Sequence, residues 1–236
     1  MLHDYKTKPS SIQELREFYD QEFQRCIIKD EDRSYHWMAE KLLKPFLSGK
    51  KILDVGCGGG FFLKYTSHNA KLHVGLDVSM QALQIASRTS ASSSYVQGSG
   101  ENLPFSSQSF DALVCLGSLE HFLDIPKTLG EFRRLLKDDG WLFLLVPNLF
   151  WYKDILSVLK TGDIGYRNQE FEFFTTPAHW EEIITGANLR IEKRWKYNGI
   201  SKHPVKQWLK DKLIPMNLSY CIIFGCRKLG QVSTTY

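Results

Sequence analysis

Seven short runs along the chain predict β-strands; the first five are nearly continuous in apolar residues, and the last two are strand-like. Strands are expected at Lys51–Val55, Lys71–Leu76, Ser94–Gln97, Phe110–Leu116, Trp141–Val146, Leu189–Tyr197 and Leu218–Arg227. The first five are apolar on both faces, which is typical of strands in a parallel sheet that helices cover on both sides.

Apolar residues at helical spacing separate these runs. Helices are expected at Ser11–Cys26, Arg33–Phe46, Phe61–Tyr65, Ser79–Ser87, Ile125–Leu136 and Pro177–Gly186. Gly140, which follows the polar residues of "KDD", is expected to cap the end of the fifth helix. Strands and helices that alternate at this spacing form right-handed crossovers, so the sequence predicts a doubly wound, Rossmann-like α/β sheet.

The chain has 236 residues, enough for one substantial core and rather few for two domains. We therefore expect a single domain. Its predicted parts are an N-terminal helical cap at 1–49, a central core at 50–147, a lid and helix at 148–187, and C-terminal strands with a basic insertion at 188–236.

A glycine-rich turn follows the first strand, in "KILDVGCGGGFF", Lys51 to Phe62. In an open α/β sheet, ligands bind outside the carboxyl ends of the strands. Glycine at such a turn permits positive φ and lets a ligand approach the main chain. The strand, turn and helix start therefore predict a ligand site.

The pattern of the turn narrows the ligand class. A P-loop would need Gly-Lys-Ser/Thr after Gly60, where Phe61 and Phe62 stand, and the G-x-G-x-x-G dinucleotide pattern lacks its third glycine in either register. Nucleotide hydrolysis and nicotinamide-dependent oxidoreduction are therefore disfavoured. The pattern that fits is D-x-G-x-G-x-G, formed by Asp54 and its three glycines.

Asp77 ends the next strand, 23 residues after Asp54. A carboxylate there can accept both hydroxyls of a ribose, and Asp54 can hold an ammonium group. Together with the glycines, these acids describe S-adenosylmethionine better than a phosphate-bearing nucleotide. The structural alternatives are that Asp54 caps the turn and that Asp77 is the N-cap of the following helix.

With "ILDVGCGGG", "GLDVS", "SGENLPFSSQSFDALVCLGSLEHFLD" and "LLKDDGWLFLLVPN", the chain resembles the class I S-adenosylmethionine-dependent methyltransferases, specifically the type-11 family. The resemblance spans about residues 50–148 and implies a mainly parallel seven-stranded sheet whose last strand is antiparallel. It also implies S-adenosyl-L-methionine as the cofactor, bound by Asp54, Gly56, Cys57, Gly58, Gly60, Asp77, Val78, Ser99, Gly100, Glu101, Leu116 and Gly117. Ser99 departs from the family, which usually has an aspartate near the adenine.

The methyl acceptor must be read from other residues. The resemblance places His121 of "SLEHF" near the cofactor, as a base, as a group that orients the acceptor, or as a histidine that satisfies local backbone groups. The motifs of DNA methyltransferases are absent after the fourth strand, which argues against DNA as a substrate. We expect no metal site, since neither the cysteines nor the histidines have ligand spacing.

An aromatic segment at 150–174 and a basic amphipathic segment, "HPVKQWLKDKLIP", lie on the cofactor's side of the predicted sheet. Residues 188–236 carry ten Lys/Arg against two acidic residues. These features favour a small aromatic, quinone-like or lipid-like acceptor, amphiphilic or acidic, with contact at a membrane periphery. The structural alternatives are that the aromatic residues form a small core of their own and that the basic residues form a solvated surface. The functional alternatives are methylation of protein or RNA and a non-catalytic cofactor-binding scaffold.

The sequence also bears on cellular compartment. Five scattered cysteines without a pairing pattern favour a reducing environment, and the charged N-terminus has no secretory signal. We therefore expect the protein in the cytoplasm, with the oligomeric state left open.

Overall fold

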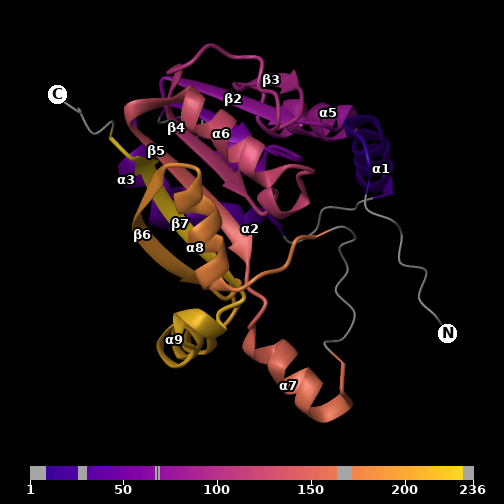
Figure 1. The fold of residues 1–236 in the computed structure, drawn as a ribbon, viewed down its shortest axis with the longest axis vertical. Helices are drawn as coiled ribbons and strands as arrows, with labels where there is room; N and C mark the ends of the chain where they lie inside the picture. The colour runs from indigo at the N-terminus through magenta and orange to yellow at the C-terminus, as the bar shows by residue number, and fades with distance from the viewer. Residues whose placement is uncertain (1–8, 26–30, 67, 69, 164–171, 231–236) are drawn as a thin grey trace.

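A computed structural model describes residues 9–25, 31–66, 68, 70–163 and 172–230 (Figure 1). Its centre is a seven-stranded sheet in the order β3-β2-β1-β4-β5-β7-β6. The strands are β1 Lys51–Val55, β2 Leu72–Asp77, β3 Ser94–Gln97, β4 Phe110–Leu116, β5 Leu136–Pro147, β6 Leu189–Tyr197 and β7 Cys221–Lys228.

The pairs from β3 to β5 are parallel, and β7 runs antiparallel to both β5 and β6. This confirms the predicted doubly wound sheet with an antiparallel last strand. The chain moves outward from β1 to β3 and then returns to β4, so the order reverses between β1 and β4. In an open sheet, this reversal places a ligand crevice at the carboxyl ends of those two strands.

Helices cover both faces, because alternate residues of each buried strand point to opposite sides. On one face, Leu53 and Leu113 pack in a cluster with Phe132 of α6 and Trp180 of α8. On the other, Ile52 packs with Met38 and other apolar residues of the N-terminal helices and α4. The helices of these layers are α2 Glu31–Trp37, α3 Lys44–Leu47, α4 Phe61–Thr66, α5 Met80–Thr89, α6 Ile125–Leu135 and α8 Pro177–Gly186.

Three further helices lie at the margins of these layers (Figure 1). They are α1 Ile12–Arg25, α7 Tyr152–Thr161 and α9 Pro204–Leu213. The first and last match predicted amphipathic segments, although the predicted end of the first helix at Cys26 lies outside the described residues. Helix α7 was not predicted, because its aromatic-rich surroundings resembled an irregular lid. No helix in the described part of the chain is both long and apolar enough to cross a membrane.

Several predicted boundaries were wrong. The last strand begins at Cys221 and not at Leu218, which lies in a 3-10 turn. Helix α6 ends at Leu135 with Leu136 as its C-cap, and Gly140 lies inside β5, which begins five residues earlier than expected. A Cβ at Gly140 would stand 2.7 Å from Leu136 Cδ1 and 3.0 Å from Asp111 O. Gly140 is thus explained by close packing of β5 against its neighbours, not by a helix cap.

The predicted helix at Arg33–Phe46 is also interrupted, by a π-helical segment at Met38–Leu43 between α2 and α3. Pro45 follows this segment, in the first turn of α3. Proline has no N–H for the regular i→i−4 bond, which explains why the hydrogen-bond pattern changes there.

Candidate functional site

The glycine turn after β1 combines positive φ angles with tight packing. Gly56, Gly58 and Gly60 have φ of +73°, +50° and +75°. A Cβ at Gly56 would lie 2.5 Å from the Cβ and Oγ of Ser118, which follows β4, and one at Gly60 would lie 2.9 Å from Ala86 Cβ of α5. Any side chain at Gly56 or Gly60 would therefore displace the neighbouring element, so these two glycines let the segment after β4 and helix α5 pack directly on the turn.

Asp77, at the end of β2, fixes the shape of this turn. Its Oδ2 accepts a hydrogen bond from Gly58 N and its Oδ1 accepts one from Ser79 N, both at 2.9 Å. The N-cap of α5 is Ser79, whose Oγ accepts from Ala82 N, so the alternative that Asp77 is the N-cap was wrong. A carboxylate offers about four acceptor positions, so lone pairs remain for two ribose hydroxyls.

Asp54, at the tip of the neighbouring strand β1, is 3% exposed. Burial, and next the charge of Asp77, raises the pKa of Asp54 to about 8. Burial also raises the pKa of Asp77 to about 6, although its bonds from backbone amides oppose that shift. Both carboxyls would be stabilised in their charged form by a positively charged group placed between the strand tips.

Helix α1 lies against this loop, at the edge of the molecule in Figure 1. Asp20 Oδ1 accepts from Ser79 Oγ at 2.6 Å and from Gln81 N at 3.2 Å, which ties α1 to the start of α5. The ring of Phe23 would stand 3.4 Å from a Cβ at Gly58. Sequence reasoning expected helices over this face but missed these residues, since only the fold brings α1 to the turn.

The loop after β3 contains Ser99, Gly100 and Glu101, and it packs on the segment that follows β4. Glu101 Oε1 accepts from Leu123 N at 2.8 Å, and a Cβ at Gly100 would lie 3.0 Å from the ring of Phe122. Ser99 Oγ accepts from Glu101 N at 3.3 Å, so this hydroxyl supports the loop's own turn.

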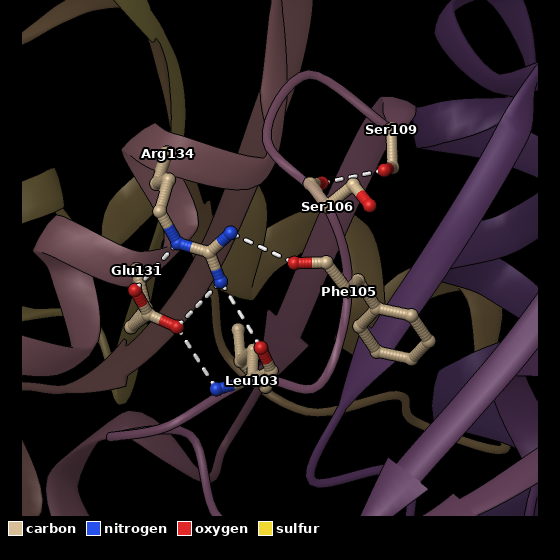
Figure 2. A network of polar contacts seen from close by, with 6 residues as sticks. All are labelled: Leu103, Phe105, Ser106, Ser109, Glu131 and Arg134. Carbon is tan, nitrogen blue, oxygen red and sulfur yellow. Dashed lines mark hydrogen bonds and ion pairs between the residues drawn. The ribbon is translucent and has the colours of Figure 1, made fainter.

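Arg134 of α6 holds the next part of that loop (Figure 2). Its guanidinium donates to the carbonyl oxygens of Phe105, at 2.7 Å, and Leu103, at 3.0 Å. It is paired in turn with Glu131, which accepts from Leu103 N. The loop predicted to flank the adenine is therefore held at two points, by the segment before α6 at Glu101 and by α6 itself at Leu103 and Phe105.

The end of β4 brings Leu116 and Gly117 beside the glycine turn. Gly117 has φ of +76° and donates from its N to Leu145 O, and Ser118 Oγ donates to Gly56 O at 3.1 Å. The predicted residues near the tips of β1, β2 and β4, including Cys57 and Val78, therefore border one site. Their contacts with a cofactor stay predictions.

A buried polar cluster follows β4. Glu120 and His121, in a single 3-10 turn, lie beside Glu172 of the segment before α8, and donor atoms of all three lie within 4.8 Å of one another. His121 Nε2 is 3.8 Å from Glu172 Oε1, and Phe173 N donates to Glu120 O at 2.9 Å. Burial raises the pKa of Glu120 to about 8. Carboxylate and imidazole donors at this spacing could hold a divalent cation.

Tyr19 of α1 packs edge-on against His121, with ring centroids 6.0 Å apart. Burial, and next the charge of Glu120, raises the pKa of the Tyr19 phenol. Sequence reasoning identified His121 but missed Tyr19 and Glu172, because these residues are distant in sequence. The cluster can hold or move a proton, or orient a polar group of an acceptor.

Comparison with known proteins identifies the family. A model of the methyltransferase domain matches residues 53–144. A ubiquinone biosynthesis O-methyltransferase of Salmonella paratyphi A is 34% identical over 175 residues, which is 70% of each chain. The uncharacterized protein MJ1252 of Methanocaldococcus jannaschii is 33% identical over 188 residues, 77% of this chain and 70% of its own.

Solved structures agree on the fold. An S-adenosylmethionine-dependent methyltransferase of Mesorhizobium loti superposes with a TM-score of 0.63 at 16% identity, covering 82% of this chain and 98% of its own. The [4+2]-cyclase SpnF superposes with a TM-score of 0.66 at 18% identity, covering 92% and 97%. At such identities the likeness concerns the fold alone, and the family follows from the closer relatives. The chain belongs to the class I S-adenosylmethionine-dependent methyltransferases, and S-adenosylmethionine is its methyl donor.

Proposed function

We propose that this enzyme methylates an oxygen atom of a small, largely apolar molecule. The ubiquinone biosynthesis O-methyltransferases that it resembles at 34% identity support transfer to oxygen. The observation that carries the proposal is the position of His121, which is only 8% exposed and lies between Tyr19 of α1 and Glu172 of the segment before α8. These neighbours leave little of the imidazole exposed, which favours a small molecule over a folded protein or RNA as the acceptor.

The site residues have separable roles in this proposal. Bound S-adenosylmethionine supplies an electrophilic methyl group, and Asp54 and Asp77 hold its amine and ribose. His121 accepts the proton of the acceptor hydroxyl as the oxygen becomes the nucleophile. Glu172, 3.8 Å from His121 Nε2, stabilises the imidazolium that results.

The experiment supplies tritium-labelled methyl donor and separates organic-extractable products from macromolecules in a cell extract. Label in the extractable fraction is expected. A His121→Ala variant should lose at least about 100-fold in kcat, in line with typical general-base contributions, with unchanged affinity for the donor. His179→Ala is the matched control, because this histidine on α8 is half exposed. Label that appears only in protein or RNA would overturn the small-molecule assignment, and full activity of His121→Ala would overturn the proposed base.

We also infer that the enzyme works in the cytoplasm. Among the described residues, Cys57, Cys115 and Cys226 are free thiols, and all three are buried. Free thiols are typical of a reducing compartment. Fractionation of the native host should find the protein with cytoplasmic markers or at the cytoplasmic face of a membrane, and recovery from the secreted fraction would contradict this.

A further inference from the structure

Large apolar side chains are exposed mainly on α7 and α9. Of the fourteen such side chains among the described residues, eight belong to these two helices: Ile155, Leu156, Val158, Leu159, Val205, Trp208, Leu209 and Leu213. Leu159 is 77% exposed and Leu213 is 72% exposed. We refer to these eight residues as the apolar surface. Such a concentration on a water-soluble fold marks an interaction site more often than chance exposure does.

Neither helix uses its apolar residues to build the core. The only buried side chain of α7 is Asp154, and none of the described side chains of α9 is buried. In a helix that packs on its own domain, the apolar face turns inward. Here the polar residue of α7 turns inward and the apolar residues turn outward, so the apolar surface is available to a partner.

The start of α7 is anchored to the segment that joins α9 to β7. The rings of Trp151, just before α7, and Tyr220, after α9, have centroids 4.7 Å apart. Asn148 Nδ2 donates to the carbonyl oxygens of Asn217 and Ser219, both at 2.9 Å. Figure 1 shows α7 and α9 projecting from the same end of the molecule. The apolar residues of both helices can therefore meet one extended partner.

Lysines accompany the apolar residues. Lys153 and Lys160 fall on one side of the apolar face of α7 at helical spacing, and α9 carries Lys206, Lys210 and Lys212. Lys212 Nζ lies 5.6 Å from the centroid of the Trp208 ring. Apolar side chains with a Trp and flanking lysines are the composition of helices that lie in the interface of an anionic bilayer.

We propose that α7 and α9 together dock the enzyme on the surface of a membrane rich in anionic lipids. The apolar surface enters the region between headgroups and acyl chains, and the lysines contact the headgroup phosphates. A second copy of the chain is disfavoured as the occupant, because a symmetric face-to-face pair would bring lysines against lysines.

This inference deepens the proposed function, on which its catalytic meaning rests. Asn148 directly follows β5, whose end neighbours the end of β4 near His121. Docking through α7 therefore places the carboxyl ends of β4 and β5 close to the lipid. An acceptor dissolved in the bilayer then reaches the site with little exposure to water.

The experiment measures sedimentation of the full chain with vesicles of phosphatidylcholine alone and with vesicles that also contain about 30% phosphatidylserine. We expect at least about 10-fold tighter binding to the anionic vesicles, weakened by added salt. A Leu159→Ser/Leu213→Ser variant should bind at least about 10-fold more weakly. The control is Leu72→Ser/Leu229→Ser, which alters two exposed leucines outside the apolar surface and should bind like the unaltered chain.

Calorimetry measures the donor affinity of each variant. A normal affinity shows that the variant is folded, and it separates failure of the docking proposal from failure of the proposed function. If the unaltered chain binds neither kind of vesicle but keeps normal donor affinity and turnover, the docking surface alone is refuted and the proposed function stands. Equal effects of the two double variants would also refute the docking surface. Concentration-dependent dimers that form without lipid, and that the Leu159→Ser/Leu213→Ser variant abolishes, would reassign the apolar surface to self-association and overturn the proposal.

Discussion

The protonation of Asp54 should control how tightly the enzyme binds its methyl donor. Asp54 is buried beside Asp77, and its pKa is about 8. An ammonium group interacts favourably only with the ionised carboxylate, so binding must lower this pKa and release a proton. At pH 7, only about one-tenth of the free enzyme has Asp54 ionised, so donor affinity is about 10-fold, or about 1.4 kcal/mol, below its high-pH limit.

The sign follows from this linkage. Because the free enzyme holds the proton and the complex does not, affinity rises with pH until the pKa of Asp54 is reached. Between pH 6 and 7, where an α-amino group stays largely protonated, the dissociation constant should fall about 10-fold. Asp77, with a pKa of about 6, adds to the slope at the acidic end of this range.

Isothermal titration calorimetry in two buffers of different ionisation enthalpy measures both the affinity and the number of protons released. We expect roughly one proton released near pH 7 for the unaltered enzyme. Asp54→Asn should bind the donor more weakly and lose most of the slope, whereas Glu181→Gln, on α8, should keep it. An unchanged dissociation constant from pH 6 to 7 without proton release would refute the reasoning, as would an Asp54→Asn variant that retains the slope.

Two further predictions concern the elements around the donor. Gly56→Ala should lower the free energy of unfolding by about 2 kcal/mol more than Gly162→Ala, since both adopt positive φ but only Gly56 faces a close neighbour; urea titration measures this, and equal losses would contradict it. Asp20→Ala should loosen α1 and weaken donor binding several-fold, because α5 loses two hydrogen bonds at its start. Hydrogen exchange of α1 and calorimetry test this, with exposed Glu17→Ala as the control, and an unchanged exchange rate would count against the role of Asp20.

The class of fold and the donor could be read from the sequence because their signals are local. A strand, a glycine turn and a helix start occupy about fifteen consecutive residues, so the pattern around Asp54 and Gly56 is complete without knowledge of distant segments. The alternation of strands and helices then allows few topologies. The structure accordingly confirms the sheet, its antiparallel last strand and the convergence of the strand tips.

Contacts between distant segments were decided only by the tertiary structure. Asp20 and Ser79 are 59 residues apart in the sequence, and His121 and Glu172 are 51 apart. No short sequence pattern can therefore predict either contact. Gly140 resembled a helix cap because its need for space comes from Asp111 and Leu136, which pack beside it only in the folded sheet. Likewise, the helical spacing of α9 was visible, but whether its apolar face turns inward or outward depends on what the rest of the chain places against it. Periodicity determines that a helix has an apolar face, and packing alone determines what that face meets.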